Sequence, residues 1–191
     1  MNLVATLGAS ALLTALAASL VAAIASAVGH RRGSRALILA GRRAITACAC
    51  LTTLAVATLA YALLVNDFSI AHVASVSSRN MQVAMKWASL YSGQPGSMLF
   101  WTWTMSLFMW AFTAITVPKI PWGGAHAVGT MGVILASFLL ALNFFASPFT
   151  LSPVTPPDGQ GLNPLLVDPG MLIHPPFLLT GLVSTAIPFT L

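Results

Sequence analysis

The chain carries long apolar runs, and these limit its fold more than any other feature. A helix needs about 20 mostly apolar residues to cross the roughly 30 Å hydrocarbon core of a bilayer. The runs cover residues 3–28, 44–65, 97–117, 125–147 and 175–191. Only 6% of the residues are charged, whereas a soluble domain usually carries about 25%. We therefore expect an all-α, polytopic membrane helical bundle, with about five transmembrane helices in a single membrane domain over residues 1–191.

The basic residues are concentrated between the first two runs. Five of the eight Lys and Arg residues lie there, and they are Arg31, Arg32, Arg35, Arg42 and Arg43. Lys and Arg next to a span favour the cytoplasmic side. The sequence pI of about 10.0 then reflects membrane topology, and we expect no nucleic-acid partner. The N-terminus and the connections 66–96 and 148–176 are predicted to lie outside.

Both outer connections are predicted to contain short surface helices. Residues 79–91 have the pattern of an interfacial amphipathic helix, with apolar side chains on one face. The fifth run is short, because the 15 residues from Phe177 to the end of the chain give about 22 Å of helix at 1.5 Å per residue. We expect the chain to be a fragment of a longer protein or one piece of a split one.

The spans carry no charged residue in their interior, although such residues are the usual functional markers inside a membrane. Four histidines are present: His30 and His126 on the predicted inner side, His72 and His174 on the outer side. We expect His72 to be a satisfied surface histidine. Trp101, near the outer end of its span, is typical of an interfacial aromatic belt.

His174 has a distinctive local sequence. Asn163-Pro164 and Asp168-Pro169 each resemble a helix N-cap followed by proline at the first helical position, so they predict two short helical turns. Pro175 disfavours helical geometry at His174, and Pro175-Pro176 is predicted to begin the fifth span. The imidazole would then be held on a stiff backbone where a surface turn meets a span. These residues favour a haem axial ligand and a purely structural role about equally.

Several segments resemble the CcmF family of cytochrome c biogenesis proteins, which belongs to the haem-handling superfamily with CcmC and CcsA. Residues 163–176, NPLLVDPGMLIHPP, are similar to the family segment LNPLLQDPGLIIHPP. Residues 65–75 resemble VNDFSVxYVAS, residues 96–101 resemble GSLLLW, and residues 147–149 resemble NPF. Pro95 stands where the family usually has Glu. The resemblance runs from about residue 61 to residue 189, the N-terminal part of that family.

The resemblance implies a component of the haem lyase of cytochrome c maturation. Such proteins take haem from the chaperone CcmE and help to attach it to the Cys-x-x-Cys-His motif of apocytochrome c, at the outer face of the plasma membrane and with CcmH-type thiol proteins. His174 matches one of two outer histidines that ligate the haem iron. The supporting residues would be Asn163, Pro164, Asp168, Pro169, Pro175, Pro176 and Trp101.

The second outer ligand and the intramembrane histidines for haem b lie further along the family's chain. The resemblance therefore implies that the C-terminal remainder of the lyase is a partner, and that lyase activity depends on it. The alternative is a non-catalytic membrane anchor or assembly subunit without a cofactor.

Overall fold

The computed structural model describes residues 2–120 and 124–190, and nearly all regular structure within them is helical. The elements are α1 (Leu3–Arg32), α2 (Arg35–Val65), α3 (Ala71–Val76), α4 (Val83–Ser89), α5 (Gly93–Ile115), η1 (Val117–Lys119), α6 (Gly124–Phe144), η2 (Pro164–Leu166), α7 (Pro169–Ser184) and α8 (Ala186–Phe189). The one β pairing in this part of the chain is an isolated bridge between Ile70 and Leu151.

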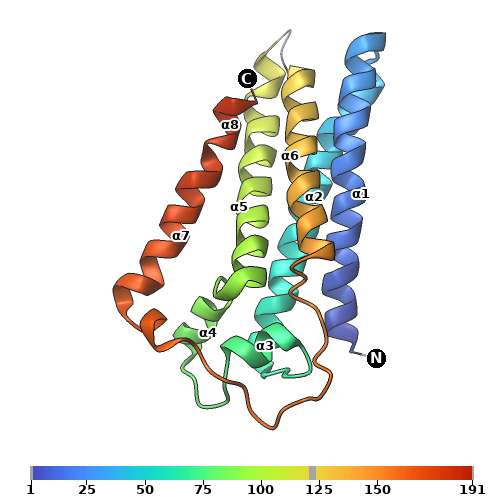
Figure 1. Cartoon of the computed structure of the whole chain (residues 1–191). Coiled ribbons are helices and arrows are strands. Elements are labelled where there is room, and N and C mark those ends of the chain that lie inside the picture. Colours follow the sequence, from blue (N-terminus) through green and yellow to red (C-terminus); the bar gives the residue numbers. More distant parts are fainter. Residues whose placement is uncertain (1, 121–123, 191) are drawn as a thin grey trace.

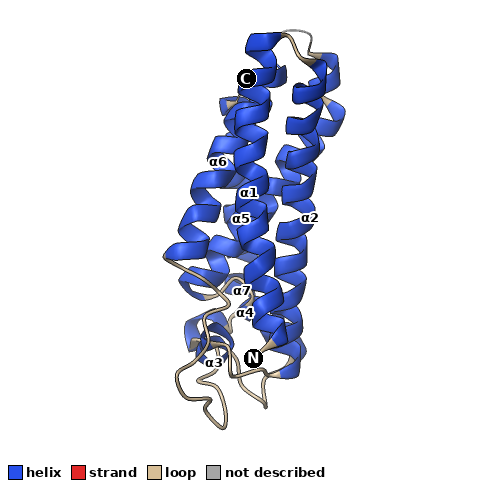
Figure 2. Cartoon of the chain, turned by 90° about the vertical axis from the view of Figure 1, so that its right-hand side faces the viewer, coloured by secondary structure: helices blue, strands red, loops and turns tan. Residues whose placement is uncertain are grey.

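Five helical segments among the described residues are long and apolar enough to cross a membrane: Leu3–Arg32, Arg35–Val65, Gly93–Lys119, Gly124–Phe144 and Leu172–Phe189. They confirm the predicted all-α, multi-pass membrane bundle. The helices run side by side, with α7 at one edge next to α5 (Figure 1). The short helices α3 and α4 lie at the same end of the bundle as the N-terminus (Figures 1 and 2).

The two ends of the bundle differ in charge. We call the end that holds α3, α4 and η2 the loop end, and the end that holds residues 29–43, 113–120 and 124–126 the arginine end. All three acidic residues, Asp67, Asp158 and Asp168, belong to connections at the loop end. The six cations Arg31, Arg32, Arg35, Arg42, Arg43 and Lys119 belong to the arginine end. The two connections predicted to lie on the same side of the membrane are thus together, at the end opposite these six cations.

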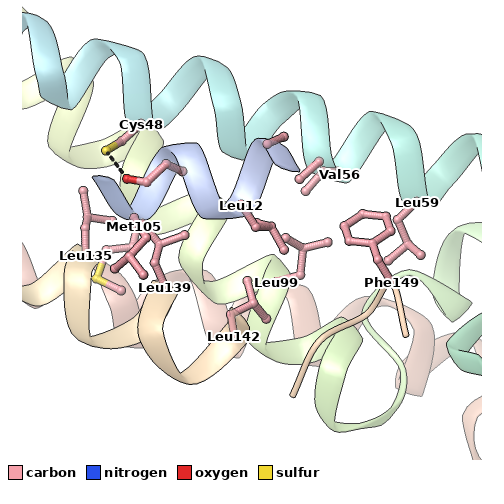
Figure 3. Packing of buried hydrophobic residues seen from close by; sticks show 14 of the residues in the cluster. Leu12, Cys48, Val56, Leu59, Leu99, Met105, Leu135, Leu139, Leu142 and Phe149 are labelled. Atoms are coloured by element: carbon pink, nitrogen blue, oxygen red, sulfur yellow. Dashed lines mark hydrogen bonds between the residues drawn. The ribbon is translucent and has the colours of Figure 1, made fainter. Parts of the chain in front are cut away.

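The core is built from α1, α2, α5 and α6. Leu12, Leu59, Leu99, Leu139 and Leu142 are buried side chains from these four helices, and they pack together in Figure 3. Helices approach closely where glycine removes the side chain, which is how helix pairs gain contact in lipid. A Cβ atom at Gly132 of α6 would lie 2.5 Å from the backbone nitrogen of Ala23 in α1.

The second and third spans begin earlier than the apolar runs indicate. The second span begins at Arg35 rather than near residue 44, since Ser34 is its N-cap and its side chain accepts a hydrogen bond from the Leu37 N–H. The third begins at Gly93, and Pro95 lies in its first turn. The first N–H groups of a helix have no intrahelical acceptor, so proline costs little there.

The two connections at the loop end bind each other. The Ala71 N–H donates to the Thr150 carbonyl at 2.9 Å, and the Gln160 N–H donates to the Ala74 carbonyl at 2.8 Å. The Arg79 N–H donates to the Asp158 carboxylate at 2.9 Å. The loop end is therefore a folded cap, which holds the segment leading into α7 against the bundle.

Helix α4 lies within the predicted interfacial helix but is shorter than residues 79–91. Its apolar residues Val83 and Trp87 are exposed, whereas Lys86 is buried. The Lys86 ammonium donates to the Asn66 side chain at 2.7 Å, which ties α4 to the end of α2. Exposed Val83 and Trp87 suit a helix at a membrane interface.

Candidate functional site

The segment before His174 folds into the two predicted helical turns. Asn163 precedes η2, and its carbonyl accepts the Leu166 N–H at 2.8 Å. Asp168 is the N-cap of α7, and its carboxylate accepts the Gly170 N–H at 2.8 Å. Pro164 and Pro169 occupy the first positions of η2 and α7, where the missing N–H has no cost. These caps fix the direction in which α7 starts.

His174 lies inside α7, so the predicted break in the helix at Pro175 is wrong. The helix runs without interruption from Pro169 to Ser184 and contains both Pro175 and Pro176. A proline inside a helix removes one hydrogen bond and displaces the carbonyl four residues earlier. Here the affected carbonyls are those of Met171 and Leu172, in the turn that carries His174.

Tyr91 supplies the hydrogen bond that Pro176 cannot give. Its hydroxyl donates to the Leu172 carbonyl at 2.5 Å, from the segment between α4 and α5. Burial raises the pKa of Tyr91 above its usual range, so the hydroxyl stays protonated and able to donate. The proline pair in a helix is the sequence signal that could have indicated such a donor, because it leaves two carbonyls without helical partners. The identity of the donor could not be read from it.

The His174 side chain is exposed, and its neighbours are apolar. Ile173 is 60% exposed, and Phe177 and Leu178 are 76% and 58% exposed. Residues three and four apart share a helix face, so His174, Phe177 and Leu178 form one accessible stripe. An imidazole beside exposed apolar surface fits a flat apolar ligand that carries a metal, such as haem. Pro175 and Pro176 stiffen the backbone beneath it.

Trp101 does not join this stripe. Its ring lies 6.4 Å from the Phe138 ring, measured between centroids. Trp101 and Phe138 line a groove of about 440 Å³ with Leu182, Val183 and Phe189. Leu182 is eight residues beyond His174, which is about 12 Å of helix rise. The indole N–H of Trp101 is buried without a hydrogen-bond partner among the described residues.

His72 differs from the predicted surface histidine, because it is only 5% exposed. It lies in α3, and its ring packs against the backbone at Gly96. Burial lowers the pKa of His72 to about 4. A hydrogen bond with the backbone of Ser89 raises this pKa, but by less than burial lowers it. His72 is thus a core residue, and His174 is the exposed histidine at the loop end of the described chain.

The described residues contain no group of three or more His, Cys, Asp or Glu side chains that could hold a metal ion. The stripe on α7 therefore offers a single imidazole rather than a complete ligand set. It could supply one axial ligand to an iron whose other positions are filled by a porphyrin and a second donor.

Comparison with known proteins agrees with this fold. The sequence profile of the family described as "Cytochrome C assembly protein" matches residues 91–191. The cytochrome c-type biogenesis protein CcmF of Haemophilus influenzae is 31% identical over 188 residues, 98% of this chain and 29% of that protein. CcmF of Pseudomonas aeruginosa is 34% identical over 186 residues, 96% of this chain and 28% of that protein.

A solved structure titled "Cytochrome c Heme Lyase CcmF" superimposes with a TM-score of 0.82 at 23% identity, over all of this chain and 30% of the other. The chain thus spans under a third of the length of these relatives.

Fold and site together define a multi-pass membrane protein, a helical bundle with one accessible histidine where α7 leaves the folded cap. The chain belongs to the Cytochrome C assembly protein family, whose profile matches more than half of it.

Proposed function

We propose that this chain is a component of the haem lyase of cytochrome c maturation, and that His174 is an axial ligand of the haem iron. The observation that carries the proposal is the exposed imidazole on α7, beside Phe177 and held by the Asp168 cap and the Tyr91 hydrogen bond. Iron ligation uses neutral imidazole. Asn163, Pro164, Pro169, Pro175 and Pro176 shape the backbone that presents it.

Haem is here a substrate that the chain holds during transfer. When bound, it supplies the vinyl groups that become linked to the Cys-x-x-Cys-His thiols of apocytochrome c. His174 would fix the iron, and the apolar stripe would carry the porphyrin face. The chaperone CcmE would deliver the haem, a CcmH-type thiol protein would assist, and the C-terminal remainder of the lyase would complete the site and contain haem b.

We place the chain in the plasma membrane, and the charge separation supports an orientation with the loop end outside. Six cations lie at the arginine end, and Lys and Arg near spans favour the cytoplasmic side. The N-terminus and His174 would then face the periplasm, where apocytochrome c is matured. The described residues would form a single membrane domain.

The proposal is tested with His174→Ala and the matched variant His126→Ala. His126 is also an exposed histidine, but it lies at the arginine end. Each variant is expressed with the remainder of the lyase, and holocytochrome c yield and haem absorbance are measured. We expect His174→Ala to lower both about tenfold or more, because loss of an axial ligand removes a metal bond. An unchanged yield and spectrum would show that His174 has another role.

The alternative is a membrane anchor or assembly subunit without a cofactor, favoured by the apolar spans and by the presence of only one exposed imidazole among the described residues of the loop end. It predicts that both histidine variants retain full holocytochrome c yield. It also predicts that deleting the chain destabilises its partner subunits, which quantitative blotting of the membrane fraction would detect.

A further inference from the structure

The arginine end contains a cavity of about 720 Å³, lined by residues from the end of α1 and the start of α2 on one side and from η1 and the start of α6 on the other. His30, Arg35 and Arg42 supply its basic lining, and Ile38, Val117 and Ile120 supply apolar lining. We propose that this cavity binds the phosphate headgroup of an anionic membrane lipid. The site lies at the opposite end of the bundle from His174 and does not depend on the proposed haem chemistry.

The cavity has positive charge without a carboxylate to neutralise it. The three acidic residues of the sequence all belong to the loop end. Arg42 donates one N–H to the Thr113 carbonyl at 3.2 Å, which uses one of its five donors. The counter-ion must therefore come from outside the chain, and guanidinium groups bind phosphate well because their donors match its oxygens.

Two helix starts add to this field. Arg35 is the first residue of α2 and Gly124 is the first described residue of α6, and both line the cavity. The N-terminus of a helix carries partial positive charge and free N–H groups, and it favours a bound phosphate. The N-termini of α2 and α6 thus add positive potential to that of the basic side chains in the cavity.

The mixed lining indicates a lipid rather than free phosphate. Ile38, Val117 and Ile120 offer contact to an apolar ligand portion, and an inorganic ion would leave them unused. The volume lies within the roughly 300–1,000 Å³ of typical ligand sites, well above the need of one phosphate ion. Basic pockets between transmembrane helices at the cytoplasmic side suit such headgroups.

The experiment measures thermal unfolding of the purified chain in a zwitterionic detergent. The additives are short-chain phosphatidylglycerol, phosphatidylcholine with the same acyl chains, and inorganic phosphate, each titrated at matched concentration. A ligand that binds only the folded state stabilises it by RT ln(1 + [L]/Kd), so the rise in unfolding temperature along each titration reports the dissociation constant. The variants are Arg35→Gln, Arg35→Gln/Arg42→Gln, and the control Arg31→Gln/Arg32→Gln, which removes two cations of the same end that do not line the cavity.

We expect phosphatidylglycerol to stabilise the chain, with phosphatidylcholine and phosphate having little effect. The double variant at Arg35 and Arg42 should bind about 30-fold more weakly, since each basic residue near an anionic headgroup contributes roughly a factor of five. The control should stay within about threefold of the unmodified chain.

Three outcomes would overturn the proposal. Equal loss in the two double variants would show diffuse attraction, and equal stabilisation by phosphatidylcholine would show that charge is not recognised. Equal stabilisation by phosphate would identify a free-ion site. The single variant Arg35→Gln should fold normally, because Arg35 is exposed and its side chain makes no hydrogen bond within the described residues. We expect it to bind phosphatidylglycerol about fivefold more weakly than the unmodified chain.

Discussion

His72 shows how a single residue can leave its expected environment. Its sequence neighbours indicate a surface connection, but α3 packs the ring into the loop end. A Cβ atom at Gly96 would lie 3.0 Å from both Cε1 and Nε2 of His72, so the ring occupies space that only glycine leaves open. Nε2 is buried without a hydrogen-bond partner in the described structure. A charged imidazole is therefore strongly disfavoured at this position.

The stability of the chain should depend on pH through His72. Its pKa falls from the usual 6.5 to about 4 because of burial, so the unfolded state binds more protons between these values. The free energy of unfolding is therefore highest above pH 6.5. It decreases as the pH falls from 6.5 to 4 and is constant below pH 4. The loss amounts to about 3 kcal/mol. Unfolding midpoints measured from pH 4 to pH 8 in detergent test this dependence.

Two variants test whether His72 causes this pH dependence: one removes the buried histidine, and the control removes an exposed one. His72→Phe should flatten the profile between pH 4 and pH 6.5, whereas His174→Gln, at an exposed residue, should keep the slope. Hydrogen bonds from the backbone of Arg79 and Gly159 hold the pKa of Asp158 below its usual 3.8, so this carboxyl titrates below the window. A slope that persists in His72→Phe would assign the effect to another group.

At the scale of elements, the contact between α1 and α6 depends on glycine. A Cβ atom at Gly132 would lie 2.5 Å from the Ala23 nitrogen and 2.8 Å from the Ser19 carbonyl oxygen. These are backbone atoms of a helix, so they cannot move aside as a flexible side chain would. Gly129, one turn earlier on α6, is also near α1, but its Cβ would meet Ser26 and Ala23 at 3.6 and 3.7 Å.

Gly132→Ala should therefore destabilise the bundle, and Gly129→Ala should not. We expect a loss of about 1–3 kcal/mol for the first, as for overpacking elsewhere. The second should be neutral or gain up to about 1 kcal/mol from the better helix propensity of alanine. Titration with sodium dodecyl sulfate, followed by helix content, measures both. Equal effects at the two glycines would mean that α1 and α6 do not pack as closely as described.

The apolar runs predicted the spans because lipid leaves a backbone few alternatives to a helix. The helix starts were less predictable, since they depend on single capping residues such as Ser34 and Asp168. The course of α7 through Pro175 and Pro176 was missed. Sequence rules give the cost of a proline pair in a helix, but they cannot show that Tyr91, some 80 residues away, supplies one of the missing hydrogen bonds.

At the scale of the whole molecule, the span formed by α7 and α8, Leu172–Phe189, is the least buried of the five candidate spans among the described residues. Its outward residues, including Phe177 and Leu182, are exposed, and it lies at the edge beside α5 (Figure 1). The folded cap made by the two connections is joined to α7 by the hydrogen bond from the Tyr91 hydroxyl to the Leu172 carbonyl. This bond lies one half-turn before His174 and determines how firmly the histidine is presented.

Tyr91→Phe should loosen the first part of α7 without unfolding the bundle. The Leu172 carbonyl loses its donor, which costs about 1 kcal/mol at a half-buried position. Amide exchange in residues 172–180 should then become about fivefold faster, because local opening requires less free energy. Hydrogen–deuterium exchange with peptide resolution measures it. Tyr61→Phe is the matched control, since it removes the same hydroxyl from an exposed tyrosine of α2.

A second substitution distinguishes the hydrogen bond from the packing of the ring. Pro176→Ala restores an N–H four residues after Leu172, which can donate to the same carbonyl within the helix. In Tyr91→Phe/Pro176→Ala the exchange of α7 should return to the rate of the unmodified chain, because the carbonyl again has a partner. If the double variant exchanges as fast as Tyr91→Phe, the hydroxyl does not act through Leu172. If Tyr61→Phe accelerates α7 equally, the effect is not local to the tether.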